Sequence, residues 1–412
     1  MAVYLDHAAT TPMLPEVLAA YTAALGLVGN PSSIHSQGQN ARRMLEEARE
    51  QVAASVVADA AEVTFTSGGT ESINLAIKGL YWARNTPVVG VTPVAEVTRP
   101  VEVTPVVERS RDPHPLPGTR RRPRILVARA EHHATIDSVE WLEAHEGAVI
   151  DWVPVNADGE IDLGYLEAAL ADDVALVTLL WANNEVGSLQ PVAEVVALAA
   201  AHGVPVHCDA VSAYGHVPID FHASGLAAMS ISAHKVGGPV GIGALVISRA
   251  ATITPLVHGG NQQRSRSGTM DAAGAVAFGR AASLIRPGTT ALRDRLIAGV
   301  RDAVPEAVLR GSANRLPNNA HFTFPGCEGD SLLFLLDVAG FSVSTGSACQ
   351  AGVPEASHVL LAMGLSEPEA RGALRITLGH TTTAAEVDAF VAALPAAVDR
   401  AGAAGLAEGV RR

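Results

Sequence analysis

The sequence predicts an α/β protein with a mainly parallel sheet of seven strands and helices on both of its faces. Apolar runs of strand length alternate with helical patterns over much of the chain, which is typical of parallel strands joined by helices. The residues with reactive side chains follow the ends of several of these runs. Because ligands of such sheets bind outside the carboxyl ends of the strands, we expect the functional site there.

The elements of this sheet follow one another in the first two thirds of the chain. An amphipathic stretch at 38–57 predicts a helix, the run EVTFT that ends at Thr66 predicts a strand, and a second helix follows Gly69. Six further strands are predicted at 124–130, 148–153, 175–182, 204–210, 227–232 and 242–248. Beyond about residue 256 the pattern changes to long helices with strands at 319–324 and 373–379, which predicts a second, smaller α+β domain.

Composition limits the class of protein. A chain of 412 residues with 48% hydrophobic content can bury two substantial cores. The sequence contains no apolar run of membrane-spanning length, and its start, MAVYLDHAATTP, lacks the regions of a secretory signal, so we expect a cytoplasmic protein that does not bind membranes. The net charge of −13 argues against direct nucleic-acid binding. The three cysteines, Cys208, Cys327 and Cys349, are too widely spaced to predict a disulfide framework or a metal site.

The segment 86–123 interrupts the alternation of strands and helices. It is rich in proline, valine and threonine, repeats VTPV, and ends in a cluster of arginines. Proline at this density cannot continue a central strand or a helix, so we interpret the segment as a surface insertion. The alternative is an arm that docks a partner protein.

One lysine stands out because the chain has only two lysines against twenty-seven arginines. Lys235 lies in SAHK, after an apolar strand and before the glycine-rich run VGGPVGIG. A primary amine at a strand end suits a cofactor that forms a Schiff base, and arginine cannot form one. Taken alone, Lys235 would be better explained as a solvated charge beside a turn, and only the surrounding motifs favour the cofactor role. We interpret Lys78 as a charge on a helix surface.

Two motifs at strand ends could contact an anionic, planar cofactor. The segment TSGGTES follows a strand and opens a helix at Gly69 and Thr70, where free backbone amides favour a phosphate. The segment EHH follows the next strand, and His132 could stack on a ring or move protons. Each also has a simpler explanation, a helix cap for the first and ordinary loop polarity for the second.

Two more motifs, NNEVG and HCDA, also end apolar strands. Asp209 could hold the proton of a pyridinium ring, and Asn184 could bind a ring hydroxyl. Helix capping after a strand is the alternative for each. Their joint occurrence with Lys235 favours pyridoxal 5′-phosphate (PLP) as the cofactor.

These motifs together resemble the cysteine desulfurases of the IscS/NifS-like group, a branch of the class V aminotransferases. The resemblance runs from LDHAATTP through TSGGTES, EHHA, NNEVG, HCDA, SAHK, RSGT and STGSAC to LRITLG. It implies the fold type I architecture of PLP-dependent transferases. We expect a large PLP-binding domain at 13–257 and a small domain formed by 258–412 together with 1–12.

The resemblance implies a role for each matching residue. Lys235 would carry PLP, Asp209 would pair with the ring nitrogen, and His132 would stack on the ring. The phosphate would be held by Gly69, Thr70, Ser232, His234 and Thr269, the last donated by the neighbouring subunit of a homodimer. Asn184 would contact the ring hydroxyl, Ser212 stands where the family commonly has a glutamine that bonds the ring oxygen, and Arg375 would bind the substrate carboxylate, with Asn184 beside it.

The resemblance also implies the reaction. L-cysteine would be converted to L-alanine, and its sulfur would pass to Cys349 as a persulfide and then to an acceptor protein, either an iron-sulfur scaffold or a thiolation enzyme. The small residues around Cys349 suit an exposed nucleophile, whereas we expect Cys208 and Cys327 to be buried. The alternatives are another class V PLP enzyme, such as an aminotransferase or a selenocysteine lyase, and a noncatalytic sulfur-carrier scaffold. No metal ion is expected.

Overall fold

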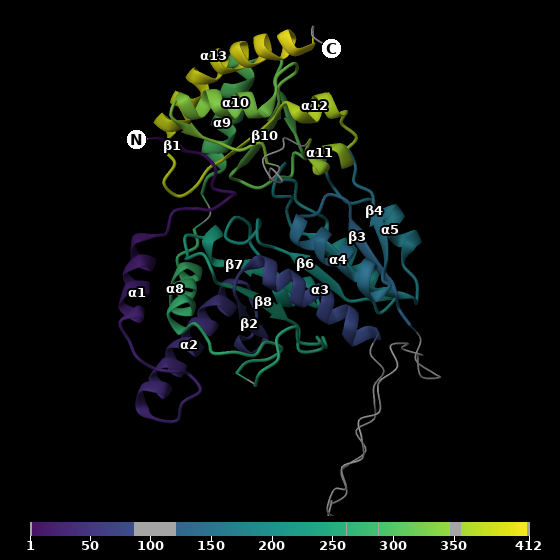
Figure 1. Cartoon of the computed structure of the whole chain (residues 1–412), viewed down its shortest axis with the longest axis vertical. Helices are drawn as coiled ribbons and strands as arrows, with labels where there is room; N and C mark the ends of the chain where they lie inside the picture. Colours follow the sequence, from purple (N-terminus) through teal and green to yellow (C-terminus); the bar gives the residue numbers. More distant parts are fainter. Residues whose placement is uncertain (1, 86–120, 261, 287, 347–355, 410–412) are drawn as a thin grey trace, which may run out of the picture.

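The computed structural model describes residues 2–85, 121–260, 262–286, 288–346 and 356–409. The predicted insertion, apart from residues 121–123, therefore lies outside the described residues, as does Cys349. Figure 1 shows the chain as two bodies, a larger one built on the main sheet and a smaller one that carries the C-terminal helix.

The larger body contains the seven-stranded sheet that the sequence predicts. Its strands are, in spatial order, β2 (Val63–Thr66), β8 (Gly243–Ile247), β7 (Ala228–Ser232), β6 (Val206–Asp209), β5 (Val174–Leu180), β3 (Arg124–Ala128) and β4 (Val149–Val153). β8 runs antiparallel to both of its neighbours, and every other pair is parallel. The mainly parallel sheet is thus confirmed.

Successive residues of a strand point to opposite faces of the sheet. Because the strands here carry apolar residues on both faces, helices cover both. Ile125 and Val127 of β3 pack in one apolar cluster with α3 (Gly69–Asn85) and α4 (His133–Glu146). Leu126 belongs to the cluster on the opposite face. Four helices contribute to that opposite cluster: α2 (Ser36–Ser55), α5 (Leu163–Ala169), α6 (Val192–Ala201) and α8 (Ala272–Ser283).

The smaller body is organised around an antiparallel sheet. Its strands are β12 (Ala373–Thr377), β10 (Asn319–Thr323) and β9 (Val308–Arg310), and its helices are α9 (Thr290–Ala303), α10 (Gly329–Val338) and α13 (Ala384–Gly409). The start of the chain joins this body, because β1 (Val3–Tyr4) pairs in parallel with β11 (Phe341–Ser342) and Leu5 is buried in its core. The boundary between the two domains at residues 257/258 stays a prediction. α8 belongs by sequence to the range predicted for the small domain, but it packs on α1 (Pro15–Leu25) and α2 beside the large sheet.

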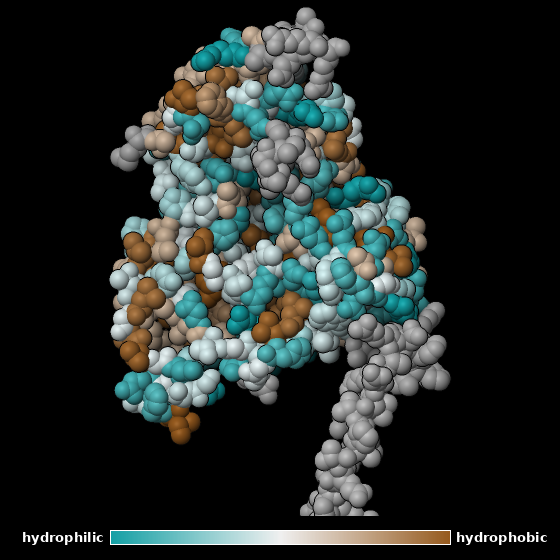
Figure 2. Space-filling view, viewed as in Figure 1, coloured by the Kyte–Doolittle hydropathy of each residue, from teal (hydrophilic) through white to brown (hydrophobic). Residues whose placement is uncertain are grey.

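Short elements complete the described fold. They are η1 (Ala60–Glu62), α7 (Phe221–Ser224), η2 (Ala233–Lys235), α11 (His358–Ala362) and α12 (Glu367–Arg371). Apolar side chains reach the surface over α1 (Figure 2), and the exposed apolar residues from the end of α1 to the start of α2 include Leu25, Val28 and Ile34. Across the residues described, none of the helices combines the length and apolar character needed to cross a bilayer.

Candidate functional site

The predicted site residues converge at the carboxyl ends of the central strands. β6 ends at Asp209, β7 ends at Ser232, and η2 carries Lys235 away from that end. Leu180 at the end of β5 pairs in register with Asp209. The motifs HCDA and SAHK, and the end of the strand that precedes NNEVG, therefore lie at one edge of the sheet, as the parallel topology predicts.

Lys235 is held by the N-terminal segment of the chain. Its Nζ donates hydrogen bonds to the carbonyl oxygens of Ala8 and Ala9, the second at 3.1 Å. Burial, reinforced by the positive charge of Arg375, lowers the pKa of Lys235 to about 8. A substantial fraction of the amine is therefore neutral near physiological pH, as a Schiff-base lysine requires.

Asp209 is buried at the end of β6 and accepts a hydrogen bond from the Val211 amide at 2.9 Å. Burial raises the pKa of Asp209 to about 6, although that bond and the positive charge of Lys235 oppose the rise. Asp209 is thus mostly ionised at neutral pH and can pair with a protonated ring nitrogen.

His132 caps the N-terminus of α4. Its Nδ1 accepts a hydrogen bond from the Ala134 amide at 3.0 Å, so the proton of the neutral ring lies on Nε2. Desolvation by the surrounding protein, reinforced by the positive charge of Lys235, lowers the pKa of His132 to about 4. The ring is uncharged and still accessible to solvent, which suits stacking on a planar cofactor.

The start of α3 lies against the ends of β6 and β7. A Cβ atom added to Gly69 would come within 2.8 Å of Val211 Cγ2 and 3.9 Å of Ser232 Cβ, so only glycine leaves this approach open. The first amides of a helix lack intrahelical partners and attract anions. Thr70 is exposed in this first turn. His234 of η2 lies with its Nδ1 3.3 Å from Thr10 Oγ1.

Arg375 projects from β12 of the smaller body toward the same edge. Its Nη1 donates to the carbonyl oxygen of Asn184 at 2.8 Å, and its Nη2 donates to Asp6 Oδ1 at 2.9 Å. Arg375 Nε and Asn184 Oδ1 are buried without a hydrogen-bond partner among the described residues. Since buried polar atoms are normally paired, these two atoms fit a polar ligand with acceptor and donor groups. The residues present therefore fit PLP with an amino acid substrate.

Two spaces lie beside Lys235. A narrow one is lined by Asn184, Ser212 and Lys235, which places Ser212 next to the predicted ring-binding residues. A second, of about 500 Å³, is lined by Lys235, His216 and His380 among others. Lys235 thus borders space that can admit a small molecule.

The structure brings most of the predicted residues together, with two exceptions. Thr269 is exposed between β8 and α8, and its role toward a neighbouring subunit stays a prediction. Cys349 lies outside the described residues, but the chain on both sides of it is placed. Ser344 bridges the backbone of Arg375, and Ser357 donates to Glu185 Oε2 at 2.5 Å. The expected burial of Cys208 and Cys327 is confirmed.

Several residues at the site were not predicted from the sequence. Asp6, Ala8 and Ala9 contact Arg375 or Lys235, and Glu131 and Glu185 are buried carboxyls beside predicted residues. The two glutamates belong to the motifs EHH and NNEVG, so their position could have been inferred. The contacts that the N-terminal segment makes with Lys235 and Arg375 produce no recognisable pattern in the sequence, so they could not have been inferred.

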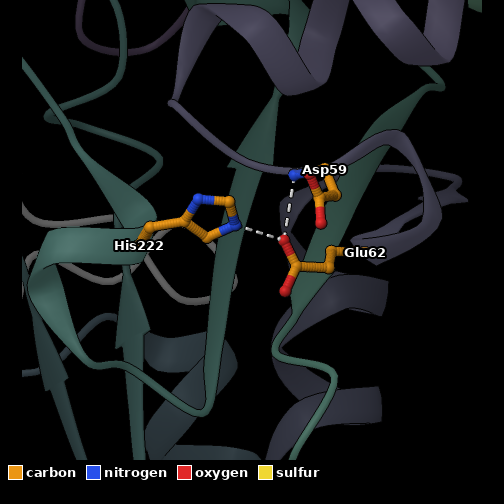
Figure 3. A group of neighbouring side chains, drawn as sticks. All are labelled: Asp59, Glu62 and His222. Atoms are coloured by element: carbon orange, nitrogen blue, oxygen red, sulfur yellow. Dashed lines mark hydrogen bonds and ion pairs between the residues drawn. The ribbon is translucent and has the colours of Figure 1, made fainter.

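A separate group of Asp59, Glu62 and His222 has the residue types of a metal site (Figure 3). Glu62 Oε2 already accepts hydrogen bonds from the Asp59 amide and His222 Nε2, at 2.9 and 2.8 Å. Asp59 is paired with Arg249 at 2.7 Å. A cation already balances the exposed carboxylate, so we interpret this group as a link that joins η1, α7 and the end of β8.

The comparisons with known proteins agree with this geometry. Residues 3–92 and 114–390 match the aminotransferase class-V family, and the chain belongs to that family. Within it the chain is similar to an IscS-like cysteine desulfurase of Mycobacterium tuberculosis, with 49% identity over 98% of both chains. The cysteine desulfurase IscS of Dictyoglomus turgidum is 39% identical over 92% of this chain and 90% of its own. The resemblance seen in the motifs is thus confirmed.

Solved structures extend the agreement to the fold. A NifS-like protein superposes with a TM-score of 0.82 at 31% identity, covering 97% of this chain and all of its own. A NifS-like protein from Rickettsia africae gives 0.80 at 29% identity over 97% of this chain and 100% of its own. These matches confirm the fold type I architecture.

Proposed function

We propose that this protein is a PLP-dependent cysteine desulfurase that converts L-cysteine to L-alanine and retains the sulfur as a persulfide on Cys349. The observation that carries the proposal is the convergence of Lys235, Asp209 and Arg375 at one edge of the sheet, with Arg375 Nε and Asn184 Oδ1 left unpaired. Relatives named as cysteine desulfurases over nearly the full chain support it.

Each residue contributes one step of recognition. The amides at the start of α3, with Thr70, Ser232 and His234, would hold the phosphate of PLP. Asp209 would pair its negative charge with the ring nitrogen, and His132 would stack on the ring. Asn184 and Ser212 would bind the ring oxygen.

The substrate is oriented by its carboxylate and then loses a proton. Arg375 binds the carboxylate, which fixes the Cα of L-cysteine near Lys235. Bound PLP supplies an electron sink for the bonds at this carbon. The neutral amine of Lys235 takes the Cα proton and returns it to the carbon chain as alanine forms.

The sulfur leaves by attack of the Cys349 thiolate. The C–S bond of the substrate breaks as a new S–S bond forms, so one L-cysteine and one thiol give L-alanine and one persulfide without an external oxidant. The persulfide passes to an acceptor protein, an iron-sulfur scaffold or a thiolation enzyme. The exposed apolar residues near α1 and the exposed Thr269 support a homodimer. A cytoplasmic location, as the sequence predicts, is part of the proposal.

The test is alanine release from L-cysteine by the purified protein. Cys349→Ala should abolish turnover and leave the visible absorbance of bound PLP intact, while Cys327→Ala, which removes a buried thiol, should keep turnover. Lys235→Ala should abolish the borohydride-reducible attachment of PLP. Persulfide formation that survives Cys349→Ala would overturn the proposal. Keto-acid release in place of alanine would indicate an aminotransferase. Alanine formed only from selenocysteine would indicate a selenocysteine lyase, and a colourless protein would indicate a noncatalytic sulfur carrier.

A further inference from the structure

Glu131 is a buried carboxyl to which the proposed mechanism gives no task. It is 1% exposed and immediately precedes His132. Its Oε1 accepts a hydrogen bond from the Leu180 amide at 2.8 Å, and Leu180 pairs in register with Asp209. The Glu131 carboxyl therefore reaches the end of the strand next to the one that carries Asp209.

The second oxygen of Glu131 lacks a counter-ion. Oε2 is buried and has no hydrogen-bond partner within the described chain. The hydroxyl of Thr135, in the first turn of α4, interacts with the same carboxyl and has no other partner there. The Thr135 hydroxyl can donate to the carboxylate or accept from the carboxylic acid, so it leaves either form with one neutral partner, and an ionised carboxylate would still have no cation beside it.

The groups that face Glu131 favour the protonated form. Asp209 and the Cys208 thiol approach from β6, and His358 of α11 donates only to the Glu131 backbone carbonyl, at 2.8 Å. Burial, and then the negative charge of Asp209, raise the pKa of Glu131 to about 8, although the hydrogen bonds from the Leu180 amide and the Thr135 hydroxyl oppose the rise. Burial raises the pKa of Asp209 only to about 6. Two neighbouring buried carboxyls thus carry one negative charge at neutral pH, and it lies on Asp209.

We propose that Glu131 is a positioning residue that works as a neutral carboxylic acid, holding the end of β5 while leaving the single negative charge of the pair to Asp209. The effect of Glu131 on PLP binding rests on the proposed function, because the negative charge on Asp209 is proposed to pair with the ring nitrogen of PLP. The protonation of the buried Glu131 can be tested independently of any enzymatic activity.

The first experiment tests that structural half by thermal unfolding of Glu131→Gln and the unsubstituted protein across pH. Glu131 has a higher pKa folded than unfolded, so between about pH 4.5 and pH 8 the folded chain binds more protons. The free energy of unfolding of the unsubstituted protein should therefore fall, relative to E131Q, as pH rises through this window. The melting-temperature advantage of E131Q should grow with pH and shrink in an Asp209→Asn background, where the neighbouring charge is gone. An advantage that stays constant with pH would overturn the proposal.

The second experiment tests the consequence in the PLP-bound protein. Glutamine matches the shape of the protonated acid, so E131Q should keep PLP affinity and turnover within about twofold at neutral pH. Glu131→Ala removes the Leu180 contact and should lose both by about tenfold or more. If E131Q loses as much as E131A, Glu131 acts as an anion and the proposal fails. If E131Q passes the unfolding test while neither protein shows desulfurase activity, the proposed function fails instead.

Discussion

Arg375 and Asp6 form an ion pair of 2.9 Å between the C-terminal β12 and the N-terminal segment. Their side chains are only 6% and 19% exposed, so water screens the pair weakly. The carboxylate of Asp6 thus occupies one arm of the guanidinium that is proposed to bind the substrate carboxylate. The two carboxylates must share Arg375 or compete for it.

Asp6→Asn should therefore lower the KM for L-cysteine by about two- to fivefold, the scale of a partly screened charge pair. The amide keeps a hydrogen-bond acceptor for Arg375 but no longer repels the substrate carboxylate. Steady-state alanine release measures this change. Asp388→Asn is the matched control, because it removes an exposed aspartate paired with Arg295 at 2.6 Å far from the site and should leave KM unchanged. A KM that rises in Asp6→Asn would show that Asp6 mainly orients the guanidinium.

The lowered pKa of Lys235 predicts how PLP attachment depends on pH. Only the neutral amine reacts, and its fraction rises with pH until the pKa of about 8 is passed. The rate at which apoprotein acquires the absorbance of bound PLP should rise from about pH 6 and level off above about pH 8. A lysine with the usual value of 10.5 would show a rise that continues well beyond this point.

The control uses the scarcity of lysine in this chain. In Lys78→Arg, Lys235 is the only remaining lysine, so among the lysine side chains the measured attachment reports on that residue alone. The same plateau is expected in this variant. A rate that still climbs steeply above pH 9 would show that the amine is not desolvated as described.

The hydrogen bond between Ser357 and Glu185 predicts that replacing Ser357 destabilises the fold more than replacing the exposed Ser366 does. Ser357 donates to the buried Glu185 carboxylate, so Ser357→Ala should lower the free energy of unfolding by about 1–3 kcal/mol, the cost of an unsatisfied buried acceptor. Ser366→Ala is the control, since it removes a similar bond to Glu369 on the exposed α12 and should cost about 1 kcal/mol or less. Denaturant unfolding compares the two, and equal losses would contradict a special role for Ser357.

The sequence predicts the main sheet well because its strands are buried. Every residue of β5 is buried, so Val174–Leu180 is an apolar run interrupted only by Thr178. The predicted strand at 124–130 is too long by two residues, because Arg129 is exposed and the strand ends at Ala128. Short strands such as β9 and β11 carry too few residues to show a pattern.

The sequence predicts only part of the candidate site, and there is a physical reason why some of its residues can be predicted and others cannot. Lys235 and Asp209 end strands, so parallel topology alone brings them to one edge. The contacts of Lys235 with Ala8 and Ala9 use backbone carbonyls more than 200 positions away, and carbonyls have no residue identity. Asp6 lies in the recognised motif LDHAATTP, but only the three-dimensional structure shows that it pairs with Arg375.

The close approach of α3 to the strand ends predicts a size limit at Gly69. A Cβ at this position would lie 2.8 Å from Val211 Cγ2, well inside van der Waals contact, so Gly69→Ala should push the start of α3 away from the strand ends. PLP affinity should fall by about tenfold or more, because the helix amides would no longer meet the phosphate where the strand ends hold the ring. Fluorescence or absorbance titration of apoprotein with PLP measures the loss. The double variant Gly69→Ala/Val211→Ala removes the clashing methyl groups and should recover most of the affinity. Gly26→Ala is the control, because Gly26 follows α1 with a φ of −74° and a Cβ there would meet only the Ala23 carbonyl oxygen, at 3.5 Å, so this variant should bind PLP normally. If the double variant binds as weakly as Gly69→Ala, the clash with Val211 does not limit the phosphate site.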